Sequence, residues 1–148
     1  MASNQTSKRS RELFDSGLYC AESVLMAIAE SQGIESDIIP RIATGFCSGM
    51  SRTCDVCGAL SGAIMGLGLM TGRSSGQDSV EETYTLVQEL KKRFEERFGS
   101  THCQELIECD LGTQAGQEYF MSHNMRERCL DCTEGATEIV MALTSQKE

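Results

Sequence analysis

Cysteine thiols are the side chains in this sequence that are best suited to metal binding or redox chemistry. The 148 residues include eight cysteines, and four of these form two C-x-x-C spacings, Cys54 with Cys57 and Cys129 with Cys132. Two such pairs suit a tetrahedral zinc site or an iron–sulfur cluster, whereas a single pair suits a thiol–disulfide switch. Neither pair is followed by histidine, so the spacing does not indicate covalent haem attachment.

Four cysteines share a second property, because each is expected near the start of a helix: Cys20, Cys57, Cys103 and Cys129. A helix N-terminus carries partial positive charge and free N–H groups, so it should lower a thiol pKa and favour the thiolate that binds metals. We take these four as the candidate metal ligands. His102 adjoins Cys103 and could tune it, and Arg52 could offset negative charge. The additional candidates are Cys47, Cys54, Cys109 and Cys132.

The expected compartment supports a thiol-based site. The first ten residues contain no apolar core, so we expect no secretory signal. The longest apolar stretch, residues 56–70, is short and glycine-rich for a membrane span. We therefore expect a cytoplasmic protein without membrane insertion. In that reducing compartment, cysteines serve metal binding or redox chemistry more often than structural disulfides.

Charge and motifs exclude several other classes of function. With 13 basic and 22 acidic residues the net charge is -9, which argues against binding nucleic acid or an anionic membrane surface. The sequence contains no phosphate loop, nucleotide fingerprint or nucleophile elbow. It is compatible with a redox partner protein and with a homodimer.

The elements that must position the cysteines are predicted to be helices. Apolar residues recur in steps of three and four over residues 80–98 and 125–143, and no segment alternates with period two. Ser79 with Glu82 predicts the start of the first of these helices, and Gly99 its end. We expect one all-α domain over residues 1–148, with about five to seven helices in a compact bundle and a flexible N-terminus over about residues 1–8. The further helices are expected over residues 18–31, 56–72, 101–108 and 113–122, with a short one after Ser36.

The central predicted helix carries a stripe without side chains. Gly58, Gly62 and Gly66 lie four residues apart, on one helix face. Each glycine costs the helix about 1 kcal/mol relative to alanine. We expect a neighbouring helix or a cofactor to approach this face closely, and close packing to offset that cost.

Several segments together resemble a known family. They are residues 17–25, residues 57–65, residues 103–106 and the final helix that carries Cys129. In this order they resemble the redox-active protein family named for its C-GCAxxG-C-C cysteine pattern, from about Gly17 to Leu143, although the central motif here begins Cys57-Gly58-Ala59. The resemblance implies that Cys20, Cys57, Cys103 and Cys129 are the functional set. A similar domain occurs in split-Soret cytochromes, and that likeness also favours an iron–sulfur centre.

The leading interpretation is a redox or electron-transfer protein whose thiolates hold an iron–sulfur cluster of the [2Fe–2S] type. One alternative is a thiol–disulfide oxidoreductase that uses Cys54 and Cys57. Another is a zinc-binding domain with a structural or partner-binding role. Whether the chain is an enzyme stays open at this point.

Overall fold

The computed structural model describes residues 3–145, and every helix or strand element in that range is helical. The all-α prediction is confirmed, but the expected count of five to seven helices is too low. Eight α-helices and one 3-10 helix are present: α1 (Ser3–Asp15), α2 (Cys20–Ser31), η1 (Arg41–Phe46), α3 (Cys47–Arg52), α4 (Gly58–Thr71), α5 (Glu81–Phe98), α6 (Cys103–Ile107), α7 (Gln114–Ser122) and α8 (Arg126–Ser145).

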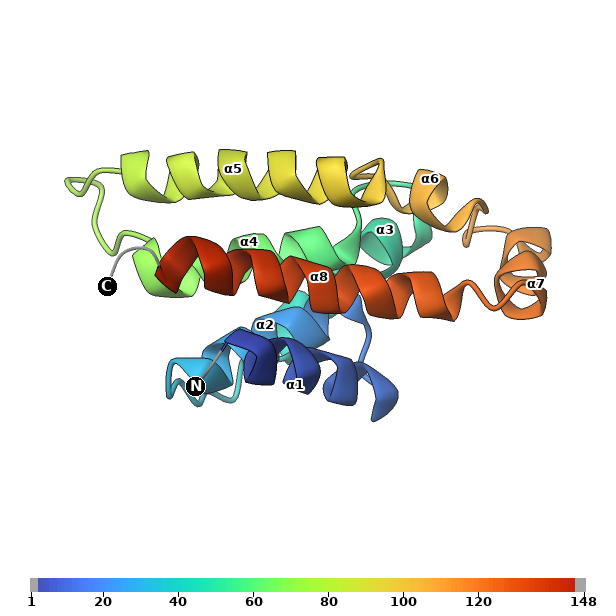
Figure 1. Ribbon diagram of the computed structural model, residues 1–148, viewed down its shortest axis with the longest axis horizontal. Helices are drawn as coiled ribbons and strands as arrows, with labels where there is room; N and C mark the ends of the chain where they lie inside the picture. The colour runs from blue at the N-terminus through green and yellow to red at the C-terminus, as the bar shows by residue number, and fades with distance from the viewer. Residues whose placement is uncertain (1–2, 146–148) are drawn as a thin grey trace.

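The long helices form three layers, as Figure 1 shows. The helices α4 and α8 lie in the middle, α5 covers one side of them, and α1 with α2 covers the other. The shorter α3 and α6 lie near one end of this bundle, and α7 extends beyond that end. The bundle core is apolar, and its largest fully buried side chains include Leu25, Leu60, Leu90, Phe94 and Val140.

The glycine stripe of α4 is the contact face for α2. A Cβ atom added at Gly62 would lie 2.6 Å from the carbonyl oxygen of Ala21, and one added at Gly66 would lie 2.5 Å from Ile28 Cδ1. At Gly58 an added Cβ would overlap the sulfur of Cys20. The predicted close approach of a neighbouring helix is therefore confirmed, and it brings the start of α2 against the start of α4.

The two longest amphipathic patterns form helices close to the predicted bounds. The predicted capping box of Ser79 with Glu82 is wrong, because the N-cap of α5 is Val80, which makes no side-chain cap hydrogen bond. The α5 helix begins beside Ser79, whose hydroxyl accepts the Glu81 N–H at 3.1 Å. It ends at Gly99, which adopts a left-handed conformation with φ of 92°. On α8, Cys132, Ala136, Ile139 and Leu143 are all buried against the core.

The N-terminus differs from the prediction. The flexible segment expected over residues 1–8 does not include residues 3–8, which form the first half of α1; residues 1 and 2 lie outside the described range. The reason is that α1 buries small hydroxyl side chains, Thr6, Ser7 and Ser10, where the apolar pattern gives no helix signal. Arg11 also joins α1 to α8 through ion pairs with Glu127, Asp131 and Glu134.

The α3 segment is the second element that the sequence did not predict, and it is left-handed. Ser48, Gly49, Met50 and Ser51 all have φ between 55° and 62°, and Arg52 follows with φ of 69°. Only glycine adopts this conformation readily, because Cβ otherwise approaches the following carbonyl oxygen. Apolar spacing carries no signal for such a turn.

No helix within residues 3–145 combines the length and the apolar composition required to cross a membrane.

Candidate thiol centre

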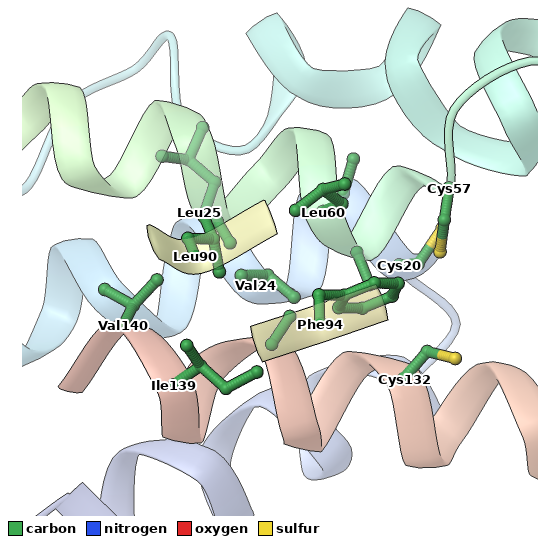
Figure 2. Packing of buried hydrophobic residues seen from close by; sticks show 14 of the residues in the cluster. Cys20, Val24, Leu25, Cys57, Leu60, Leu90, Phe94, Cys132, Ile139 and Val140 are labelled. Atoms are coloured by element: carbon green, nitrogen blue, oxygen red, sulfur yellow. The ribbon is translucent and has the colours of Figure 1, made fainter. Parts of the chain in front are cut away.

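Each of the four cysteines favoured by the sequence lies at the N-terminal end of a helix, as predicted. Cys20 is the first residue of α2, Cys57 caps α4, Cys103 is the first residue of α6 and Cys129 is the fourth residue of α8. Figure 2 shows Cys20, Cys57 and Cys132 at the same end of the packed core, beyond Phe94.

Cys57 has three thiol neighbours, Cys103, Cys129 and Cys132. Its buried sulfur accepts hydrogen bonds from the N–H groups of Ala59 and Leu60 at the start of α4, and it shares a hydrogen bond with the thiol of Cys132. That bond and burial raise the pKa of Cys57 well above its usual value, although the two N–H donors lower it. Cys57 also lies close enough to Cys103 and Cys129 to affect the pKa values of both.

Cys103 and Cys129 approach Cys57 from α6 and α8. Burial, together with negative charge on Cys57, Cys109 and Cys54, raises the pKa of Cys103 to about 12. Burial also raises the pKa of Cys129, together with charge on Cys57, Cys103 and Cys109, while Arg126 opposes this shift. We call the set linked in this way the main thiol cluster: Cys54, Cys57, Cys103, Cys109, Cys129 and Cys132.

Cys54 and Cys109 lie at the edge of the main thiol cluster, where both are partly exposed. A hydrogen bond with the Asp110 carboxylate raises the pKa of Cys54. Burial raises the pKa of Cys109, and the charges of Asp110 and Glu108 add to the shift. Acidic side chains at this edge therefore keep the outer thiols protonated.

Cys20 and Cys47 form a separate buried pair. Their thiols share a hydrogen bond, which with burial raises the pKa of Cys47. The Cys47 sulfur also accepts from the N–H of Glu22 in the first turn of α2, and its thiol donates to the carbonyl oxygen of Ala43 at 3.7 Å. Cys20 also contacts Gly58, the residue that follows Cys57. The Cys20–Cys47 pair therefore lies next to the main thiol cluster.

Backbone hydrogen bonds hold Cys57 and Cys103 of the main thiol cluster in register. The N–H of Cys57 donates to the Thr101 carbonyl at 2.8 Å, and the N–H of Cys103 donates to the Asp55 carbonyl at 2.9 Å. These bonds pair residues 55–57 with residues 101–103. At Gly49, in the left-handed turn, an added Cβ would lie 2.6 Å from the Cβ of Cys103. Gly49 therefore supplies both the positive φ and the close approach that α6 requires.

Two expectations about the cysteines need correction. The helix N-termini were expected to lower the thiol pKa values, but burial and neighbouring sulfurs outweigh the helix effect at Cys57, Cys103 and Cys129. The C-x-x-C spacing also does not define the thiol contacts. The partner of Cys57 is Cys132, on another helix, and the partner of Cys54 is Asp110.

Sequence reasoning missed these contacts because they join distant segments. The link between Cys54 and Asp110 and the pairing of Cys20 with Cys47 have no local spacing signal. The glycine between Cys47 and Cys54 was the one available hint of a close approach. His102 is exposed, and its ring lies beside the Thr101 hydroxyl at 3.3 Å.

The donor set fits a thiophilic metal or an iron–sulfur cluster in chemistry, because both take cysteine sulfur as ligand. Among residues 3–145, however, no three Cys, His, Asp or Glu side chains are arranged to hold a metal ion. Binding would therefore require the thiols to move closer together.

The comparisons with known proteins agree with a redox assignment. The profile of a family described as "Putative redox-active protein (C_GCAxxG_C_C)" matches residues 18–143. A protein of Archaeoglobus fulgidus, titled "Uncharacterized protein", is 30% identical over 151 aligned positions, which cover 95% of this chain and 94% of the relative. No solved structure gives a significant match.

Proposed function

The chain belongs to the C_GCAxxG_C_C family, and we propose that it is an electron-transfer protein whose thiol centre holds an iron–sulfur cluster. The observation that carries this proposal is the meeting of helix N-termini at the thiols. Cys57 lies close enough to Cys103 and Cys129 to raise the pKa values of both, and Cys103 also raises that of Cys129. Cys20 contacts the residue next to Cys57. These four cysteines are the proposed ligands.

Electrostatics explains why such a centre needs a positive group. Without metal, thiolates at Cys57, Cys103 and Cys129 would be buried beside other sulfurs, so the folded chain keeps these thiols protonated. Bound iron supplies the positive charge that makes several adjacent thiolates stable. When bound, an iron–sulfur cluster supplies a one-electron redox couple.

The chain's own groups would orient and stabilise the ligands. The N–H groups of Ala59 and Leu60 already donate to the Cys57 sulfur, and hydrogen bonds to cluster sulfurs tune reduction potentials. The hydrogen bonds between residues 55–57 and 101–103 fix the separation of Cys57 and Cys103. Cys109 and Cys132 are the alternative ligands. Cysteine-to-serine variants distinguish them from the four proposed ligands.

The test is anaerobic purification followed by iron, zinc and sulfide analysis and visible absorption spectroscopy. We expect iron and sulfide in equal amounts and a coloured protein. Cys57→Ser, Cys103→Ser and Cys129→Ser should each lose the colour, whereas Cys54→Ser, at the edge of the cluster, should keep it. A colourless protein without iron or sulfide after reconstitution would refute the proposal. Zinc without sulfide, with chelation lowering the melting temperature, would instead establish the structural zinc site.

A second candidate function, thiol–disulfide exchange, is favoured by the two hydrogen-bonded thiol pairs. Cys20 with Cys47 and Cys57 with Cys132 are already in contact. Oxidation of either pair forms one S–S bond and transfers two electrons and two protons to an external disulfide, which is reduced to two thiols. Peptide mapping after treatment with oxidised glutathione would show these cross-links. Cross-linking of Cys54 with Cys57 would favour the pair that the sequence spacing suggests, and eight free thiols would exclude this function.

A further inference from the structure

A cleft outside the main thiol cluster opens beside Cys20. It has a volume of about 340 Å³ and lies between the α1–α2 junction, the left-handed turn of α3 and α7. This volume is within the usual range for pockets that hold small organic ligands, which begins near 300 Å³. The side chains that matter for its chemistry are Phe14, Tyr19, Cys20, Arg52, Phe120 and Met121, with Arg126 at the start of α8.

The wall formed by α7 presents apolar side chains that no core covers. Gly116 is the one buried residue of this helix, and Figure 1 shows the helix beyond the end of the bundle. Met121 is 78% exposed, and Tyr19 on the opposite wall is 56% exposed. An aromatic ring placed between these walls would contact Phe120 and Met121 on one side and Tyr19 on the other.

The cleft contains one arginine whose charge no carboxylate within residues 3–145 balances, although the chain carries a net charge of -9. Arg126 is fixed in place, because its guanidinium pairs with Asp15 at 2.9 Å and lies over the Phe14 ring at 5.0 Å. Arg52 forms no ion pair with a carboxylate of the described residues, so its charge is available to a ligand. An anionic group is the complement of the Arg52 guanidinium.

We propose that this cleft binds a small organic anion that carries an aromatic ring, with the ring between Tyr19 and Phe120 and the acidic group at Arg52. The ligand would then lie against Cys20, which contacts Gly58, the residue that follows Cys57. This inference concerns binding alone. It does not depend on whether the thiol centre holds a metal, so it can fail while the proposed function stands.

Two matched fluorescent probes test the proposal on the full chain under reducing conditions. Anilinonaphthalene sulfonate is an aromatic anion, and phenylnaphthylamine is its uncharged analogue. We expect the anion to bind with a stoichiometry of one and more tightly than the neutral probe. Arg52→Gln should weaken binding of the anion by about tenfold and leave the neutral probe nearly unchanged. Gln is shorter than Arg, but it is also unbranched at Cβ and meets the same positive φ as Arg52, so the turn should be preserved.

Arg41→Gln is the control, because Arg41 is an exposed arginine at the start of η1 and does not line the cleft. It should leave both probes unchanged. Methyl NMR of labelled methionines gives a second measurement, in which the anion should shift the Met121 signal but not that of Met141, which is buried in the bundle. Equal losses in Arg52→Gln and Arg41→Gln, or an unshifted Met121 signal, would overturn the proposal.

Discussion

Replacing Gly62 by alanine tests whether the contact of α2 with α4 sets the position of the thiol centre. The added Cβ would lie 2.6 Å from the Ala21 carbonyl oxygen and 3.0 Å from its Cα. Both atoms belong to the backbone, so a side-chain rotation cannot relieve the overlap. The two helices must separate, and overpacking of this kind costs about 1–3 kcal/mol.

The same substitution also has a favourable part, because alanine is better than glycine in a helix by about 1 kcal/mol. We therefore expect Gly62→Ala to lower the free energy of unfolding by up to about 2 kcal/mol. Gly68 provides a matched control on the same helix, since a Cβ added there meets nothing within 4 Å. Gly68→Ala should raise the free energy of unfolding by up to about 1 kcal/mol, from helix propensity alone.

The measurement is urea unfolding followed by circular dichroism, with reductant and chelator present so that disulfides and metals do not contribute. The two variants should change stability in opposite directions, about 2 kcal/mol apart. If Gly62→Ala is as stable as Gly68→Ala, the close contact at Ala21 does not limit the helix separation. If Gly68→Ala is destabilised equally, the glycine effect lies in the helix itself and our reasoning is refuted.

Three further predictions concern the thiols and the turn. The pKa of Cys103 rises from 9.0 to about 12 on folding, so above pH 9.0 the unfolded chain loses a proton that the folded chain keeps. Stability of the metal-free protein should therefore fall as pH rises above about 9 toward 12. Urea unfolding of Cys103→Ser should show a smaller fall. Because the cluster thiols are protonated, metal loading should release protons. Calorimetry in buffers of different ionisation enthalpy measures this release. Metal binding without proton release would contradict the assigned protonation. Met50→Gly should raise the free energy of unfolding by a few tenths to about 1 kcal/mol. It removes the strain of a left-handed residue with a side chain, but it also makes the unfolded chain more flexible. A loss of stability would show that the Met50 side chain contributes more than the strain costs.

The sequence predicts the elements whose packing depends on apolar periodicity. The α5 and α8 helices are long amphipathic segments with recognisable ends, so their residues could be placed closely. The glycine stripe of α4 also predicts a close neighbour, since three glycines on one face have few other uses in a helix. It does not identify α2 as that neighbour, because many small-residue faces fit the same stripe.

The candidate site is predictable in its members but not in its contacts. Cys20, Cys57, Cys103 and Cys129 could be placed at helix starts from local sequence. The pairing of Cys20 with Cys47 and of Cys57 with Cys132 depends on how α2, α3, α4 and α8 pack together. The direction of the pKa shifts could not be predicted either, because it is decided by burial and by sulfurs from distant segments.

The left-handed turn connects the thiol pair, the main thiol cluster and the cleft. Four of its residues, Ser48, Met50, Ser51 and Arg52, have side chains and positive φ, which at about 1–2 kcal/mol each is a considerable cost. Hydrogen bonds to the Gly49 carbonyl from the N–H groups of Thr53 and Asp55 offset only part of it.

The position of the turn gives this strain a physical reason. The turn follows Cys47, whose thiol pairs with Cys20, and it brings Gly49 against Cys103. It also directs Ser48 and Arg52 into the cleft. A right-handed turn at the same residues would follow a different path and could not satisfy all three contacts. Unfavourable backbone conformations persist where the surrounding structure and function require them, so we infer that this turn is retained for the chemistry of the thiols and the cleft rather than for the stability of the bundle.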